Sequence, residues 1–321
     1  MNLSPKKVLE QFERNEINNS IAFDQLISFV ENSENEHIRE EATQILDRIG
    51  IFSEKLFGIL ENILISDTNR KIRNIALKFL ERRFLNKALT PLKWAINHEN
   101  DYECLITIIE SLKKVNSEES KLILFNEAKK IMKTKYLNKE KRIENKKFKK
   151  VLKKLLKTKK YEFFTHKELS QILINFITIA NLTKQYPNVF YEINSENGLL
   201  KELDLSDYLE FEVKGMPFGW KNNIKSISEI VGLKYLKYLK KIDLSNNQIE
   251  IFKELVNLEN LTHLILTNNK ISELENLENI KKLPNLEYLD LRNNDIVKKI
   301  HSNEFNPRIR VLLKDSYIKI K

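Results

Sequence analysis

The spacing of apolar residues changes near residue 185. Before this point, apolar side chains recur three and four positions apart, as in Leu56, Ile59, Leu60 and Ile63, and this spacing predicts amphipathic helices. Strand signals and turn glycines are nearly missing there. After this point, leucines alternate with polar residues over short runs, which is typical of strands with one buried face. The pattern predicts a helical first part and a second part built around short strands.

Residue types at the helix starts agree with this interpretation. Ser4-Pro5 and Thr90-Pro91 each place a capping hydroxyl before a proline suited to the first helical turn. Asp101 is placed to cap a helix of its own. Residues 165–168, with the sequence Thr-His-Lys-Glu, form a capping box that opens another helix.

The helical part repeats with a period near 34. Two segments, residues 32–46 and 66–80, match at four positions when they are aligned at this shift. The matched pairs are Ile38 with Ile72, Arg39 with Arg73, Ala42 with Ala76 and Leu46 with Leu80. A looser third copy, at a shift of about 32, carries Cys104, Ile108 and Leu112 and has Leu105 in place of the arginine.

Paired helices with a polar turn and Ile-Arg-x-x-Ala-x-x-x-Leu resemble HEAT repeats. The resemblance covers roughly residues 1–160 and implies an α-solenoid in which each helix pair packs on the next. In such a stack the alanines, Ala42 and Ala76, let the two helices of a repeat approach closely. Tetratricopeptide repeats share the period, but their Trp, Gly and Tyr signature positions are not evident.

Three segments near the end of the chain superpose on one another. They are Leu239–Ile249 (LKKIDLSNNQI), Leu261–Ile271 (LTHLILTNNKI) and Leu286–Ile296 (LEYLDLRNNDI). Each fits L-x-x-L-x-L-x-x-N-x-I, with Ile242 replacing one leucine. This pattern resembles the leucine-rich repeat family, and its 22-residue periodicity is similar to that of the regulatory subunits of protein phosphatase 1. The resemblance implies short parallel strands joined by outer return segments.

Each copy places one asparagine after its strand, at Asn247, Asn269 and Asn294. A buried amide at this position can satisfy backbone groups of neighbouring turns, since an unpaired group would cost about 1–3 kcal/mol. An earlier strand is expected at residues 200–205, although Tyr208 stands where asparagine is expected. The aromatic segment 215–220 forms either a packed loop or a binding element, and residues 305–317 are expected to cap the last repeat.

Strand alternation also selects a concave face that a partner could contact. The candidate protein-binding residues are Lys241, Asp243, Ser245, His263, Ile265, Thr267, Tyr288, Asp290 and Arg292, preceded by Glu202, Asp204 and Ser206. Tyrosine and arginine are favoured anchors at protein interfaces. The alternative is that these are solvated strand residues without a partner.

Positive charge is concentrated in one segment. The chain carries a net charge of +10, but residues 129–160 alone carry +14, with sixteen basic residues and two acids. Phe148, Leu152 and Leu155 share one face of a predicted helix there. The lysines that could contact phosphate are Lys146, Lys147, Lys149, Lys150, Lys153, Lys154 and Lys157. The helix could bind nucleic acid, an anionic membrane or an acidic protein, or be a packed helix with a solvated lysine-rich face.

Motifs for chemistry are missing. The six glycines of the chain form neither G-x-G-x-x-G nor a P-loop, which argues against ordinary nucleotide-binding enzymes. A single cysteine, Cys104, excludes an internal disulfide and a cysteine-cluster zinc site. No pair of histidines has a metal-ligand spacing. Some HEAT-like proteins are DNA glycosylases, but no motif of theirs matches residue by residue. We expect no enzyme activity, cofactor or metal.

The longest apolar stretch spans about 11 residues near position 175, whereas a membrane helix needs about 20. We therefore expect a soluble, cytoplasmic protein without a transmembrane segment. Its predicted domains are a HEAT-like α-solenoid over residues 1–185, which includes the basic segment, and a leucine-rich repeat with a parallel β-sheet over residues 186–321. The border is placed at Tyr186-Pro187. The predicted function is a non-catalytic scaffold or adaptor that binds another protein; the alternative is nucleic-acid binding by the basic helices.

Overall fold

The computed structural model describes residues 3–133, 142–207, 222–251, 255 and 258–314. The chain divides into two compact units, and each is described by itself. The first comprises Met1–Asn126 with Thr165–Ser170, and the second comprises Glu127–Phe164 with Gln171–Lys321. This division differs from the border expected after residue 185, because the basic helix that precedes it packs within the second unit.

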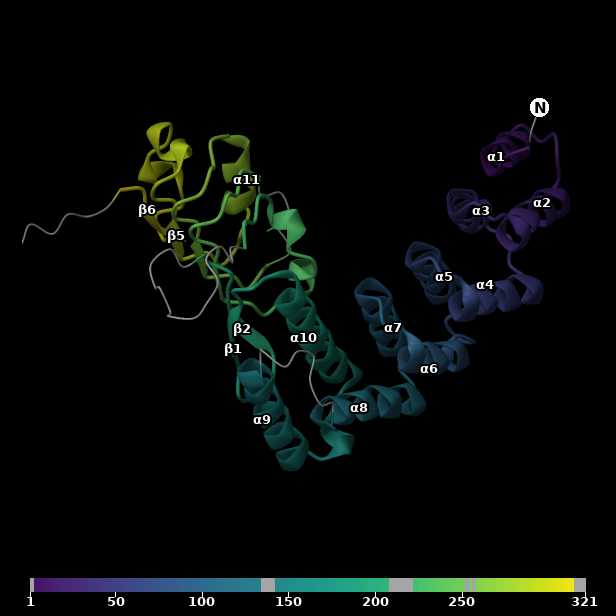
Figure 1. Ribbon diagram of the computed structural model, residues 1–321, viewed down its shortest axis with the longest axis horizontal. Coiled ribbons are helices and arrows are strands. Elements are labelled where there is room, and N and C mark those ends of the chain that lie inside the picture. The colour runs from purple at the N-terminus through teal and green to yellow at the C-terminus, as the bar shows by residue number, and fades with distance from the viewer. Residues whose placement is uncertain (1–2, 134–141, 208–221, 252–254, 256–257, 315–321) are drawn as a thin grey trace, which may run out of the picture. The chain divides into compact units, whose positions relative to one another are not determined.

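The first unit is built from helix pairs. Its helices are α1 (Pro5–Glu13), α2 (Asn19–Asn32), α3 (Glu36–Ile49), α4 (Glu54–Ser66), α5 (Arg70–Arg83), α6 (Leu89–His98) and α7 (Tyr102–Val115), followed by the start of α8 (Glu118–Lys133). Helix α2 packs on α3, α4 on α5 and α6 on α7, while α3, α5 and α7 lie side by side (Figure 1). Ala42 and Ala76 are completely buried where these helices meet.

Polar side chains start most of these helices as the sequence predicts. Ser4 caps α1 with proline in its first turn, and the Asp101 carboxylate accepts hydrogen bonds from the first backbone amides of α7. The capping box at Thr165 and Glu168 is present as well. The start predicted at Thr90 is wrong, because α6 already begins at Leu89 after Ala88. Pro91 still falls in the first turn, where its missing N–H leaves no helical hydrogen bond unmade.

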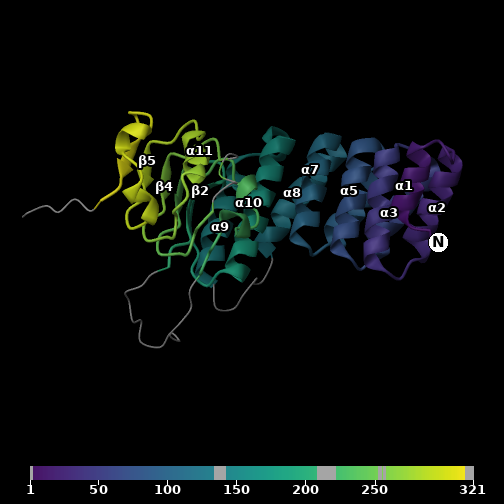
Figure 2. The same ribbon diagram turned by 90° about the horizontal axis from the view of Figure 1, so that it is seen from above.

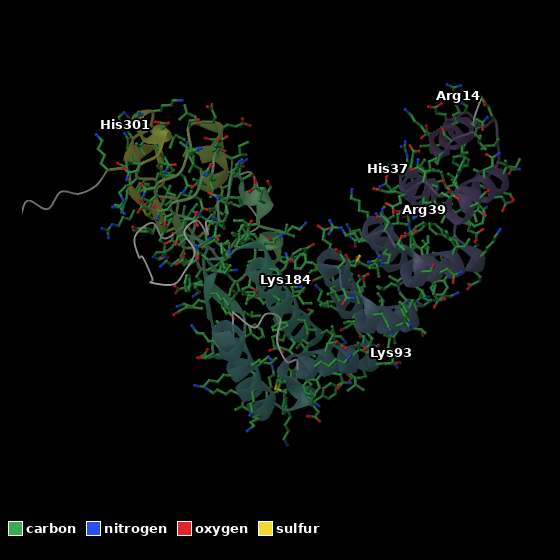
Figure 3. The ribbon with its side chains drawn as sticks, in the orientation of Figure 1. Arg14, His37, Arg39, Lys93, Lys184 and His301 are labelled. Carbon is green, nitrogen blue, oxygen red and sulfur yellow. The ribbon has the colours of Figure 1, made fainter. Side chains whose placement is uncertain are left out.

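A ladder of arginines joins successive helix pairs. Arg39 donates through Nε and Nη2 to the carboxylate of Asp67 at 3.1 and 3.3 Å, and through Nη1 to the carbonyl of Ser33 at 3.1 Å. Arg73 repeats this arrangement with Glu99, at 2.9 Å for both bonds, and with the carbonyl of Asp67 at 2.9 Å. Arg39 therefore bonds the C-terminal caps of α2 and α4, and Arg73 bonds those of α4 and α6. Arg39 is labelled in Figure 3.

Six strands form one sheet in the described part of the second unit, in the order of the chain. They are β1 (Phe190–Ile193), β2 (Leu200–Asp204), β3 (Lys241–Asp243), β4 (His263–Ile265), β5 (Tyr288–Asp290) and β6 (Arg310–Leu312). Strands β1 and β2 are antiparallel, and each later strand pairs in parallel with the one before it. The helix α11 (Glu275–Lys281) lies in the return segment between β4 and β5 (Figure 2).

Two helices flank the β1 edge of this sheet. Helix α9 (Arg142–Thr158) contacts β1, and its Phe148 packs on Phe176 of α10 (His166–Gln185) with the ring centres 5.2 Å apart. The backbone amide of Leu200 donates to the Asn175 side chain of α10 at 2.8 Å. This packing covers an edge that would otherwise expose apolar side chains and unpaired backbone groups.

The three predicted asparagines form a buried ladder across the repeats. The Asn269 amide nitrogen donates to the carbonyls of Leu244 and Leu266, both at 3.0 Å, and its oxygen accepts from the amide of Ile249 at 2.9 Å. Asn247 and Asn294 make the equivalent bonds one repeat earlier and one repeat later. The prediction that these amides satisfy neighbouring turns is confirmed.

A second asparagine ladder runs beside the first, at the residue before each buried asparagine. Asn246, Asn268 and Asn293 have φ angles of 59°, 56° and 56°, a left-handed conformation that asparagine tolerates better than most residues. Their side chains bond in series near the surface, from Asn293 to Asn268 at 2.8 Å and from Asn268 to Asn246 at 2.7 Å. The Asn-Asn doublet of each repeat therefore has two separate structural roles.

The turn after β2 is stabilised by other residues than the later turns. Tyr208 and the segment 215–220 lie outside the described residues, as do residues 315–317 of the expected cap. Asp207 is buried and accepts from the backbone amide of Asn222 at 2.6 Å. The Asn222 side chain donates to the carbonyl of Leu205 at 2.8 Å. The later ladder asparagines donate in the same way to the carbonyl of the leucine that follows their own strand. The ladder therefore begins at Asn222, which the sequence pattern did not single out.

Candidate protein-binding face

The sheet brings the predicted contact residues together in rows. One row runs through Glu202, Lys241, His263 and Tyr288, which are register partners on neighbouring strands. The next row contains Asp204, Asp243, Ile265 and Asp290, and a third, just beyond the strands, contains Ser245, Thr267 and Arg292. The middle residue of each repeat strand is buried on the opposite side. We call the surface formed by these rows on β2 to β5 the sheet face; its role in binding stays a prediction.

An aromatic pair occupies the β4 and β5 part of the sheet face. The rings of His263 and Tyr288 stack with their centres 5.5 Å apart and an interplanar angle of 22°. Half-buried Ile265 is in the next row on β4. Two fixed rings beside an aliphatic side chain form a small apolar area that loses little conformational entropy on binding.

Aspartates end two of the strands in the same manner. Asp243 accepts from the backbone amide of Ser245 at 3.0 Å and from its hydroxyl at 2.7 Å. Asp204 accepts from the corresponding groups of Ser206 at 2.9 and 2.6 Å. An aspartate that bonds the amide two residues later favours a turn, so the Asp-Leu-Ser sequence ends the strand and fixes both carboxylates on the face.

These two carboxylates are direct neighbours on β2 and β3. Burial raises the pKa of Asp243 above its usual 3.8, and the negative charge of Asp204 raises it further, against the hydrogen bonds from Ser245. A carboxyl whose pKa is raised on folding reduces stability at every pH above its unfolded pKa. The site of Asp243 therefore disfavours the ionised carboxylate.

The Asp243→Asn variant should be more stable than the unchanged protein at pH 7. The amide oxygen can still accept from Ser245, while the repulsion from Asp204 is removed. Because the effect depends on ionisation, it should disappear as the pH falls below about 3, where the carboxyl is protonated in the folded and unfolded states. Urea unfolding at the two pH values measures the difference; greater stability of the parent protein at pH 7 would contradict it.

Asp290 is the buried residue among the nine predicted contact residues, and its contact with a partner stays a prediction. Its carboxylate is buried, with 2% of the residue exposed, and it accepts from Arg292 Nε at 3.0 Å and Nη2 at 2.7 Å. Burial alone would raise the pKa of Asp290, but the hydrogen bonds that it accepts, chiefly from Arg292 and also from Thr267, outweigh burial and lower the pKa. Asp290 therefore orients Arg292, and the guanidinium is the group that a partner could reach.

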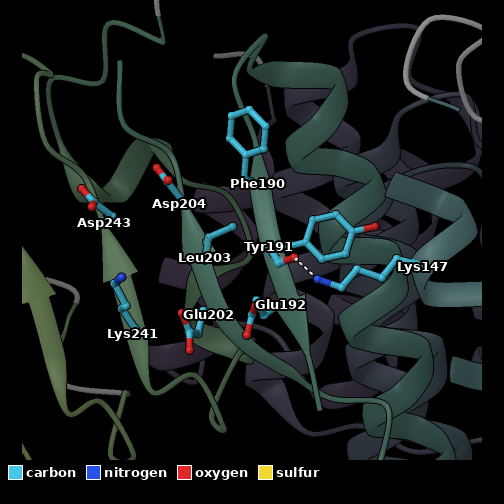
Figure 4. A pocket seen from close by; sticks show the side chains of 9 residues that line it. All are labelled: Lys147, Phe190, Tyr191, Glu192, Glu202, Leu203, Asp204, Lys241 and Asp243. Carbon is cyan, nitrogen blue, oxygen red and sulfur yellow. Dashed lines mark hydrogen bonds between the residues drawn. The ribbon is translucent and has the colours of Figure 1, made fainter. Parts of the chain in front are cut away.

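A hollow of about 410 Å³ lies at the β1 end of the sheet face. It is lined by Lys147, Phe190, Tyr191, Glu192, Glu202, Leu203, Asp204, Lys241 and Asp243. Figure 4 shows Lys147 reaching from α9 toward the carbonyl of Tyr191, 3.5 Å away. Phe190 is 52% exposed. The strand β1 and its Phe190 were not predicted from the sequence, although the aromatic and β-branched residues of Phe-Tyr-Glu-Ile favour a strand.

The predicted phosphate-binding lysines fall into different surroundings. Lys150, Lys153, Lys154 and Lys157 are exposed on α9, and Lys149 is half-buried. Lys147 lines the hollow instead, and the side chain of Lys146 lies outside the described residues. The segment 129–160 is therefore not one uniform basic surface.

The cysteine and one of the histidines are held within the helical packing. Cys104 is completely buried, and burial raises the pKa of its thiol, with further increases from Glu99 and Asp101. His166 bonds the carbonyl of Ser117 at 2.9 Å. Among the described residues, no three His, Cys, Asp or Glu side chains are grouped so that they could hold a metal ion. Within that same part of the chain, no helix has the length and apolar character to cross a membrane.

Comparison with known families matches the strand region. Residues 220–271 match the model described as "Leucine rich repeat", and residues 259–306 match the model described as "Leucine Rich repeats (2 copies)". Residues 220–306 carry leucine-rich repeats. In these repeats the buried and exposed asparagine ladders mark successive turns, and the sheet face is the set of strand positions that point away from the leucine core. Comparisons with curated proteins and with solved structures find no match.

Proposed function

We propose that this protein is a non-catalytic adaptor that binds another protein on the sheet face of its leucine-rich repeats. Leucine-rich repeats generally mediate protein–protein interaction, and the family matches lie in this region. The observation that carries the proposal is the arrangement of the face: Ile265, the His263–Tyr288 pair and fixed polar side chains lie in register on adjacent strands.

The rigidity of this face supports binding. The buried asparagine ladder fixes the turn after each strand, and the Asp-x-Ser turns hold carboxylates in place before any partner arrives. A prearranged face loses little side-chain freedom on association, so more of the contact energy remains as affinity. The charges also restrict the partner: its segment over β2 and β3 would be basic, opposite Asp204 and Asp243, and its segment over β4 and β5 would be apolar.

Two finer assignments belong to the same proposal. The helix pairs and the arginine ladder of the first unit support a HEAT-like α-solenoid, since each arginine repeats its bonds from one pair to the next. Two later strands start 22 and 25 residues after the copy before them, which supports the similarity to the repeats of protein phosphatase 1 regulatory subunits. Both would give the adaptor extended binding surfaces.

A matched pair of variants tests the proposal. Ile265→Arg places a charge at the centre of the sheet face. Leu274→Arg also replaces an aliphatic residue by arginine, but in an outer segment, at a residue that is 50% exposed. The amount of each protein that co-purifies with the unchanged chain should fall at least about tenfold with Ile265→Arg, which corresponds to a loss of roughly 1.4 kcal/mol in binding free energy. With Leu274→Arg this amount should stay the same. Equal recovery with both variants, each folded by circular dichroism, would overturn the proposal.

A further inference from the structure

We propose that helix α9 binds the phosphate backbone of duplex nucleic acid through four lysines on its exposed side, a surface separate from the sheet face. The lysine row is defined as Lys150, Lys153, Lys154 and Lys157. Three properties of α9 carry this assignment: its apolar side is already occupied, its lysine row has no acidic partner among the described residues, and the spacing of the row suits a line of phosphates.

The apolar side of α9 packs inside its own unit. Phe148, Leu152 and Leu155 are 2%, 1% and 8% exposed. Phe148 meets Phe176 of α10. A Cβ added at Gly198 would come within 2.9 Å of the Leu155 side chain, so the hairpin between β1 and β2 fits tightly against the helix. Amphipathic helices attach to membranes by burying their apolar side in the lipid, and this side is not available.

The opposite side of α9 is strongly basic. Residues 147–160 contain eight lysines and no acid. In the described part of the chain, no carboxylate lies within 4.0 Å of the lysine row, whereas lysines elsewhere are commonly paired. Examples of such pairs are Lys55 with Asp24, Lys93 with Glu119, Lys281 with Glu278 and Lys298 with Asp295. A general preference for lysine in the composition therefore does not account for α9.

The lysines of the row stand three and four positions apart. Like charges at these spacings repel across a helix surface and weaken it. A polyanion along the row would convert the repulsion into attraction. The row extends over about 10 Å at a rise of 1.5 Å per residue, and one strand of a duplex presents a phosphate about every 3.4 Å along its axis. The row can therefore face three or four successive phosphates.

The residue types on α9 favour a duplex over a single strand. Proteins that hold single strands combine basic grooves with exposed aromatic rings on which bases stack. The aromatic residue of the described part of α9 is Phe148, and it is buried. Contacts limited to phosphates carry no sequence information, so binding should be indifferent to sequence.

Fluorescence anisotropy with a labelled 24-base-pair DNA of random sequence tests the proposal on the full chain. Four phosphate contacts predict a salt slope near −3.6, so affinity should fall about 150-fold between 50 and 200 mM salt. The row variant changes Lys150, Lys153, Lys154 and Lys157 to glutamine. Its matched control changes Lys55, Lys71, Lys78 and Lys93 to glutamine, which alters the net charge equally.

The row variant should lose the binding and most of the salt dependence, because each phosphate contact removed lowers the slope by about one. The control should bind within about threefold of the unchanged protein, and circular dichroism should show both variants folded. Equal weakening of the two variants, or no binding at 50 mM salt, would overturn the proposal. Binding of phosphatidylserine vesicles without binding of DNA would also overturn it, in favour of an anionic membrane.

Discussion

Replacing Asn269 by alanine should lower the free energy of unfolding of the repeat region by about 3–5 kcal/mol. The substitution removes the acceptor for the Ile249 amide and the donors to the Leu244 and Leu266 carbonyls. All these groups are buried. The Ile249 amide is left unpaired at a cost of about 1–3 kcal/mol, while each of the two carbonyls keeps a bond from Asn247 or Asn294 and loses about 1 kcal/mol. Hydrogen exchange of peptides within residues 239–296 measures it, since this method reports the stability of one region.

The neighbouring asparagine provides the matched control. Asn268→Gly keeps the left-handed backbone that the φ of 56° requires, and it removes only exposed side-chain bonds. Bonds exposed to water contribute little, so its effect should stay below about 1 kcal/mol. Similar losses for the two variants would mean that the buried ladder does not stabilise the turns as described.

Arg73→Met should destabilise the first unit by about 3–5 kcal/mol. The side chains of Arg73 and Glu99 are only 17% and 6% exposed, and removal of one member of a buried pair leaves the other charge without its ion partner. Lys93→Met breaks an exposed pair with Glu119, whose side chains are 57% and 53% exposed, and should cost less than about 1 kcal/mol. Hydrogen exchange of peptides within residues 60–115 distinguishes the two; comparable losses would contradict the argument.

The same ion pair predicts how the first unit responds to pH. Burial alone would raise the pKa of Glu99, but the hydrogen bonds from Arg73 and from backbone amides outweigh it and lower the pKa below 4.5. The stabilisation from this carboxylate is therefore present above its unfolded pKa and is lost as the pH falls through its folded pKa. The Arg73→Met variant lacks this contribution, so the difference between variant and parent should shrink in acid.

The sequence predicted the strand region in detail because its signals are local. An eleven-residue pattern repeated three times determines which leucines are buried, and the structure places Leu244, Leu266 and Leu291 in the core as expected. Helix caps were predicted equally well at Ser4 and Asp101. In both cases the residues that interact are close in sequence or occupy the same place in successive copies.

Predictions that depended on distant contacts were less complete. The apolar side of α9 was visible in the sequence, but a period of 3.6 does not say whether it packs on preceding helices or on the strands that follow. The hollow needs Lys147 beside Tyr191, residues that no local pattern connects. Likewise, the alternation that placed Asp290 on the face could not show that Arg292 would cover it. These outcomes depend on tertiary packing, which spacing alone does not encode.

Photo-crosslinking from the sheet face tests the central claim most directly. A photo-reactive phenylalanine analogue is placed at Tyr288, beside the His263 ring, and in a second preparation at Leu274 in the outer segment. The account predicts that irradiation in cells links a discrete protein to the chain from position 288 and not from position 274. It also predicts that Ile265→Arg abolishes this product. A product from position 274 alone, or one from position 288 that persists with Ile265→Arg, would contradict the assignment of the sheet face as the binding surface.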